Sequence, residues 1–215
     1  MIITWVNAAL LSAAIMAVVN ILDSHFVTRR FPSLRAFLLP VGTIHLFYGV
    51  TGALLFGVPA GVDGSIVAVA VLSSAVRTVA VIILLDSLCH REVSRVVPVV
   101  YTYPMFVALM AFFFLGERLG LSQWIAVVVV ASGAVFIASF GQQPSLGGVE
   151  RPRSLLLFLA SVLFAVADVT GKYSLSQLGF WQLFWIGALV MGMTFVVAAL
   201  RRSVVRAITS MHGYR

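Results

Sequence analysis

Apolar residues in this chain are collected into long runs that short polar segments separate. Seven runs reach about 20 residues or more, and they cover residues 2–22, 36–58, 65–88, 96–115, 121–140, 154–175 and 180–200. Because an α-helix rises 1.5 Å per residue, about 20 residues cross the ~30 Å hydrocarbon core of a bilayer. The pattern predicts an all-α integral membrane protein, a polytopic bundle of about seven transmembrane helices.

The fourth and fifth runs form a predicted hairpin, because a very short connection at 116–120 joins them. Helices joined so closely must be antiparallel neighbours. Pro98 and Pro104 each remove a backbone donor from the fourth run, so we expect this helix to bend. The fifth run contains small residues that let another helix come close: Ala131, Ser132, Gly133, Ala134 and Ala138.

A local signature accompanies this hairpin. The turn reads Leu-Gly-Glu-Arg-Leu at 115–119, and the next helix opens with Gln-Trp-Ile at 123–125. With the proline in the preceding helix, it resembles the fourth and fifth helices of an EamA-like repeat, in the drug/metabolite transporter (DMT) superfamily. Ala126 stands where that family usually has glycine. We interpret Glu117 and Arg118 of this turn as structural residues whose opposite charges neutralise each other and close the hairpin.

The resemblance implies a bundle of two inverted five-helix repeats. We expect a first repeat at 1–140, a linker at 141–153, two helices of a second repeat at 154–200 and a basic polar tail at 201–215. Faint internal matches point the same way: AVVN at 17–20 with AVAD at 165–168, and GAL at 52–54 with GAL at 187–189. The matched helices lie five apart, an odd number, so the second copy is inverted. Either the chain is part of a ten-helix protein, or a second copy or partner chain completes the bundle.

Composition supports the membrane class and excludes others. The chain is 61% hydrophobic and 10% charged, whereas soluble domains carry about 25% charge. The net charge of +7 does not indicate nucleic-acid binding, because the basic residues lie in short loops between apolar runs. A single cysteine, Cys89, forms no internal disulfide. No zinc-protease, nucleophile-elbow or Walker motif is present, so we expect no enzyme activity, no cofactor and no metal site.

The distribution of basic residues predicts an orientation. One set of connections and the tail contain most of them: Arg29, Arg30, Arg35, Arg91, Arg95, Arg151, Arg153, Arg201, Arg202, Arg206 and Arg215. The opposite side has Arg118 and Lys172. The positive-inside rule then places the N-terminus outside and the C-terminus in the cytoplasm, in a cytoplasmic membrane. The resemblance implies both ends inside, and we follow the charge pattern.

Two charged residues fall inside predicted spans. Arg77 lies at the middle of the third span, where an arginine costs at least ~2.5–3.5 kcal/mol and must face a partner or a wet cavity. Asp168 in the sixth span is its natural partner, and Lys172, four residues along on the same face, is a second possible partner for Asp168. Two readings stay open for both: a contact for an anionic substrate with a coupled carboxylate, or an internal ion pair that locks the bundle.

Five further polar residues are candidates for the substrate site. His45 and Tyr48 lie near the middle of the second span, and Tyr101 and Tyr103 flank the bend that Pro98 and Pro104 set. Asn20, near the inner end of the first span, is a weaker candidate. Each could instead be a hydrogen-bonded core residue. We expect the first, third, fourth and sixth helices to supply the cavity walls.

Two functions of different classes follow. The first is secondary transport of a small polar or amphipathic metabolite by alternating access around a midplane cavity. The second is a non-transporting membrane subunit or scaffold that docks through the small-residue faces at 131–138 and 187–192. A transporter needs Arg77 and Asp168 to face water, whereas a scaffold would bury them as a fixed pair.

Overall fold

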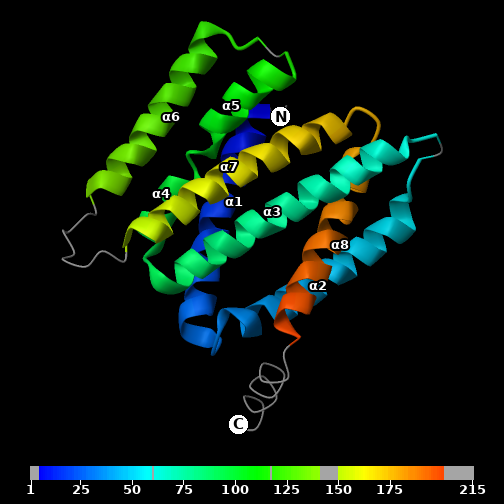
Figure 1. The fold of residues 1–215 in the computed structure, drawn as a ribbon, viewed down its shortest axis with the longest axis horizontal. Coiled ribbons are helices and arrows are strands. Elements are labelled where there is room, and N and C mark those ends of the chain that lie inside the picture. The colour runs from blue at the N-terminus through cyan, green and yellow to red at the C-terminus, as the bar shows by residue number, and fades with distance from the viewer. Residues whose placement is uncertain (1–4, 60, 117, 141–149, 201–215) are drawn as a thin grey trace.

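The chain folds into a bundle of helices in a computed structural model that describes residues 5–59, 61–116, 118–140 and 150–200 (Figure 1). The elements are α1 (Trp5–His25), a π-helical turn η1 (Phe26–Arg30), α2 (Leu34–Phe56), α3 (Gly64–His90), α4 (Val93–Val100), α5 (Tyr103–Phe114), α6 (Leu121–Phe140), α7 (Glu150–Ser174) and α8 (Phe180–Ala199). Within these residues six spans are long and apolar enough to cross a membrane, and α6 adds a shorter apolar stretch. The predicted all-α membrane bundle is confirmed.

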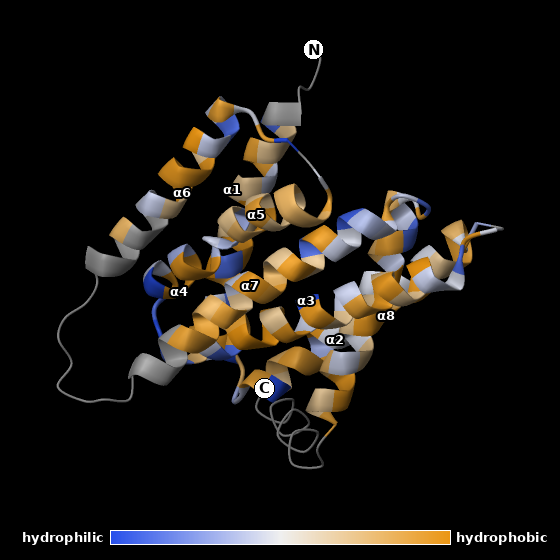
Figure 2. Ribbon diagram, turned by 45° about the horizontal axis from the view of Figure 1, so that its top comes forward, coloured by the Kyte–Doolittle hydropathy of each residue, from blue (hydrophilic) through white to orange (hydrophobic). Residues whose placement is uncertain are grey.

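Two antiparallel helix pairs form the centre of the bundle. α3 lies along α7, and α2 lies along α8 (Figure 1). α4 and α5 pack on the far side of α7, and α6 stands at the edge, where it contacts α4 and α5. Apolar residues predominate along the helices (Figure 2), and many large apolar side chains are exposed, among them Leu54, Phe113 and Phe114, as expected where lipid replaces water as the solvent.

Glycine brings α2 and α8 into direct backbone contact. A Cβ atom at Gly192 would come 2.8 Å from the amide nitrogen of Leu46 and 2.9 Å from the carbonyl oxygen of Gly42. Gly49 lies equally close to Leu189. Side chains are absent at these positions so that the two helices can cross without a gap. The two helices matched in the sequence as equivalents therefore lie antiparallel in contact, while the inverted repeat itself stays a prediction.

The predicted bend in the fourth span is a full break. α4 continues through Pro98 to Val100, and α5 starts at Tyr103, one residue before Pro104. Pro104 has no N–H to donate to the carbonyl of Val100, four residues earlier. The hydroxyl of buried Ser161 on α7 lies 3.0 Å from that carbonyl oxygen and 2.9 Å from that of Val99. A neighbouring helix thus satisfies the freed backbone group, as a bilayer interior requires.

The α1–α2 and α3–α4 connections lie at the same end of the bundle (Figure 1). Val27 of η1 packs there in one apolar cluster with Leu88 of α3 and Val96 of α4. This packing gathers the arginines of both connections, among them Arg29 and Arg91, at that end.

The predicted hairpin motif is only partly described. Glu117 lies outside the described residues, as do 141–149 and 201–215. Arg118 is exposed in the α5–α6 connection. A Cβ at Gly133 would meet nothing within 4 Å, so no described helix uses the small-residue face of α6 at this position.

Candidate functional site

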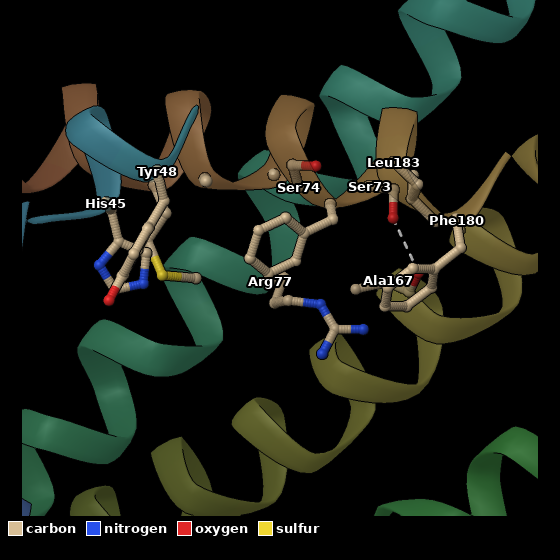
Figure 3. Close-up of a pocket in the computed structure, with 13 residues that line it drawn as sticks. His45, Tyr48, Ser73, Ser74, Arg77, Ala167, Phe180 and Leu183 are labelled. Atoms are coloured by element: carbon tan, nitrogen blue, oxygen red, sulfur yellow. Dashed lines mark hydrogen bonds between the residues drawn. The ribbon is translucent and has the colours of Figure 1, made fainter. Parts of the chain in front are cut away.

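A cavity of about 550 Å³ lies between α2, α3, α7 and α8. Its polar wall consists of His45, Tyr48, Ser73, Ser74 and Arg77. Its apolar wall includes Phe180, Leu183, Phe184, Ala188 and Met191 from α8. Figure 3 shows His45 and Tyr48 at one side, Arg77 at the centre and Phe180 at the other side. The cavity thus offers a cation within mainly apolar walls.

Small residues and hydroxyls let α3 approach α7 and α8 beside the cavity. The buried hydroxyl of Ser73 donates a 2.8 Å hydrogen bond to the carbonyl of Ala167 across the α3–α7 contact. Gly171 and Gly187 lie opposite Ser73 and Ser74, where an added Cβ would sit 3.3 Å and 3.5 Å from their hydroxyl oxygens. Both hydroxyl protons are used on carbonyls, so the serines present acceptor oxygens to the cavity.

Arg77 and Asp168 form an ion pair between α3 and α7, as the sequence predicted. The pair is not sealed, because the Arg77 side chain is 43% exposed and the Asp168 side chain 30% exposed. Arg77 lines the cavity, whereas Asp168 pairs with it from α7 and is not among the residues that line the cavity. The pair therefore combines features of both readings: the charges neutralise each other, and the guanidinium is still accessible.

The imidazole of His45 is oriented by its own helix. Its Nδ1 lies 2.8 Å from the carbonyl oxygen of Val41, and because a carbonyl only accepts, Nδ1 must donate. This leaves Nε2 for the cavity. The ring also packs edge-on against Phe195, with 6.1 Å between centroids. Tyr48 is one turn further along α2 and is exposed.

Asn20, Tyr101 and Tyr103 form a second polar group, outside the cavity lining. Buried Asn20 donates from Nδ2 to the Tyr101 hydroxyl at 3.0 Å and to the carbonyl of Met16 at 2.9 Å. Tyr103 packs against Phe164, with 6.0 Å between ring centroids. Phe164 is four residues before Asp168 on the same face of α7, so this group lies on the face of α7 that carries Asp168.

The structure divides the predicted site residues into two sets. Arg77, with Asp168 paired to it, lines one cavity with His45 and Tyr48. Tyr101 ties Asn20 of α1 to the α4–α5 break, and Tyr103 packs beside Tyr101. Their roles in binding stay predictions. In this cavity α2 and α8 join α3 and α7, where glycine packing draws α8 against α2 beside α3. The expectation that the first, third, fourth and sixth spans contact substrate stays a prediction.

Sequence reasoning missed the paired serines of α3 and the aromatic wall of α8. A signal for the serines was present, since Ser73 and Ser74 lie four and three residues before Arg77 and share its helix face. No such signal marked Phe180 or Phe184, because aromatic residues in an apolar span look alike whether they face lipid or a cavity. No group of three metal-ligating side chains occurs in the part of the chain that the structure describes.

These features define a multi-pass helical membrane protein with a charged cavity between its central helices. Comparison with protein families matches residues 3–139 to the EamA-like transporter family. The chain therefore belongs to this family, in the DMT superfamily, whose members are membrane transporters. Comparison with curated proteins and with solved structures gave no match.

Proposed function

We propose that this protein is a secondary transporter of a small polar or amphipathic metabolite. The observation that carries the proposal is the cavity of about 550 Å³ with Arg77 on its wall, inside the bundle of a transporter family. Ligand pockets have volumes of about 300–1,000 Å³ with a few polar groups in apolar walls. An arginine within a membrane span is a functional-site hypothesis by default.

The proposed mechanism is alternating access around this cavity. Arg77 attracts a negative group of the substrate, Asp168 balances its charge or takes a proton, and His45 and Tyr48 contact the polar end of the substrate. We place the protein in a cytoplasmic membrane with its N-terminus outside, on the charge pattern of its connections. Of the two docking faces of the alternative scaffold function, the one with Gly187 and Gly192 packs internally on α3 and α2, whereas the face of α6 at Gly133 is open.

The test is binding followed by flux. Purified protein is screened by thermal shift against amino acids, organic acids, sugars and cationic drugs, because a ligand of the folded state raises the melting temperature. A ligand that shifts wild type and not Arg77→Ala is then followed into liposomes that contain the protein. We expect saturable uptake above that of empty liposomes.

The matched control is Gly133→Ala, since open space surrounds Gly133. This variant should bind and transport as wild type does. Binding of the ligand without uptake above empty liposomes would contradict the transporter proposal.

A further inference from the structure

The ion pair between Arg77 and Asp168 is accessible rather than enclosed. A pair that served only to lock two helices would be best enclosed, because water and competing ions weaken an exposed pair. Here the guanidinium belongs at once to the cavity wall and to the pair. A ligand in the cavity can therefore reach the cation from the side that Asp168 leaves open.

The charge of the lining selects the ligand. Among the described residues no acidic side chain lines the cavity, and Arg77 is the charged group on its wall. The hydroxyl protons of both serines are used within the protein. The opposite wall is built from Phe180, Phe184 and Met191. These groups fit an anionic head on a flat apolar body.

An anion bound to Arg77 removes the charge partner of Asp168. The guanidinium then neutralises the ligand, and Asp168 is left as an uncompensated carboxylate within a membrane span. A charged group without a partner in such a place favours its neutral form. The charges balance if one proton enters from water: the ion pair, the anion and the proton become an arginine–anion pair and a neutral Asp168.

We infer that the cavity binds an amphipathic organic anion that displaces Asp168 from Arg77, and that each bound anion brings one proton onto Asp168. This inference rests on the proposed function and adds its substrate class and its coupling. Anion and proton occupy the protein together or not at all, so the loaded carrier is electrically neutral at this site.

Other titratable and charged groups near Asp168 could also make binding depend on pH, so the test has to distinguish them from Asp168. Arg77 faces it from α3, and the phenols of Tyr103 and Tyr101 lie on the α4–α5 side. On α7 itself Lys172 is four residues along, exposed in the last turn. On the cavity wall the titratable group of α2 is His45, and histidine is the residue type that gains charge near neutral pH.

The test uses an anion that cannot itself take up a proton in the range studied. 2-Naphthalenesulfonate is such a probe, and 2-naphthalenesulfonamide and 2-naphthylmethylamine are its neutral and cationic counterparts. Binding to purified protein is measured between pH 5.5 and 8.5, together with proton uptake by calorimetry in two buffers of different ionisation enthalpy. We expect wild type to bind the sulfonate and neither of its two counterparts. Its affinity for the sulfonate should fall about tenfold per pH unit as the pH rises, as linkage to one proton requires.

Four variants distinguish the roles. Asp168→Asn should bind the sulfonate at least as tightly as wild type at its best, with no pH dependence and no proton uptake, because Arg77 has lost its competitor. Arg77→Gln should not bind it. The double variant Arg77→Gln/Asp168→Asn, whose neutral pair avoids an unpaired charge, should fold and also fail to bind. His45→Gln should keep the pH dependence.

Several outcomes would overturn the inference. They are equal binding of the sulfonamide, no sulfonate binding by folded wild type, pH-independent binding by wild type, or loss of the pH dependence in His45→Gln. Binding that does not depend on pH is also expected if Lys172 forms an ion pair with Asp168 once the anion holds Arg77. Liposome flux separates this inference from the transporter proposal: proton-linked binding without flux contradicts transport, and flux without proton linkage contradicts the coupling.

Discussion

The two central helix pairs are built on opposite principles. α2 and α8 touch through glycines, with backbone against backbone. α3 and α7 touch through polar side chains, a buried serine hydroxyl and an accessible ion pair. Backbone contacts have one arrangement, whereas hydroxyls and charged groups can change partners without rebuilding the helices. A rigid seam, the glycine contact of α2 with α8, thus lies beside an exchangeable seam, the polar contact of α3 with α7, and the cavity lies between them.

The largest loss of stability is expected from a side chain placed in the rigid seam. Gly192→Ala places a Cβ within 3 Å of backbone atoms of α2, which neither helix can avoid by a rotamer change. We expect a loss of about 3 kcal/mol or more, seen as a large drop in melting temperature and in monodisperse yield.

Gly133→Ala is the matched control for that substitution. It makes the same chemical change in α6, where nothing lies within 4 Å of the new methyl group. It should melt with wild type or slightly above it, because alanine is the better helix former. An equal drop in melting temperature in both variants would mean that the close contact of α2 with α8 is not the cause of the loss.

A smaller effect is expected in the exchangeable seam. Ser73→Ala removes the hydrogen bond to the carbonyl of Ala167, and hydrogen bonds between membrane helices contribute about 0.6–1.7 kcal/mol. Ser74→Ala removes a hydroxyl that bonds within its own helix, to Ala70. Ser73→Ala should lower the melting temperature of ligand-free protein more than Ser74→Ala does. The reverse order would show that the cross-helix bond does not hold the pair.

The smallest effect concerns Asp63, where the ends of both pairs meet. The backbone N–H and hydroxyl of Ser65 hydrogen-bond the Asp63 carboxylate and hold its pKa below the ordinary value, and the Asp63 amide donates to Gln177 before α8. A lowered pKa means that the folded state favours the charged carboxylate. Its contribution is present above the ordinary range of aspartate, near pH ~4, and is lost as the pH falls through the lowered pKa.

The measurement is the difference in melting temperature between wild type and Asp63→Asn across this range. Asparagine keeps a helix-capping acceptor but cannot titrate. The wild-type advantage should be slight at neutral pH and should vanish in acid. An advantage that grows as the pH falls would contradict this assignment.

Much of this architecture could be read from the sequence, because lipid forces apolar runs into helices. The sequence also favoured the pairing of Arg77 with Asp168, although Lys172 on the same helix face left a second partner open for Asp168. The partners of each helix could not be predicted. A glycine such as Gly192 gives the same signal in the sequence whether it faces lipid or Leu46. The role of Ser161 is visible only in the fold, where its hydroxyl lies beside the Val100 carbonyl that Pro104 leaves without a donor.

The separation of the predicted site residues into two groups also depends on contacts between distant parts of the chain. Tyr101 and Tyr103 flank a proline break, where the sequence left a cavity wall and packing between helices equally open, and Tyr101 turns to Asn20 of α1. A break frees backbone and side chains in several directions at once, and the direction chosen depends on which neighbour supplies a buried partner. That neighbour is far away in the chain and leaves no local pattern.

The ion pair also has a consequence for how the chain is made. Arg77 and Asp168 are 91 residues apart, so at about 5–20 residues per second the ribosome needs roughly 5–18 s to produce the partner after the arginine. During that interval α3 must hold a lone cation in or near the bilayer by its own apolar content. α3 has a hydropathy of 2.4, against 1.5–1.9 for the other five described spans. The helix that carries the early charge is thus the one best able to enter the membrane before its partner exists.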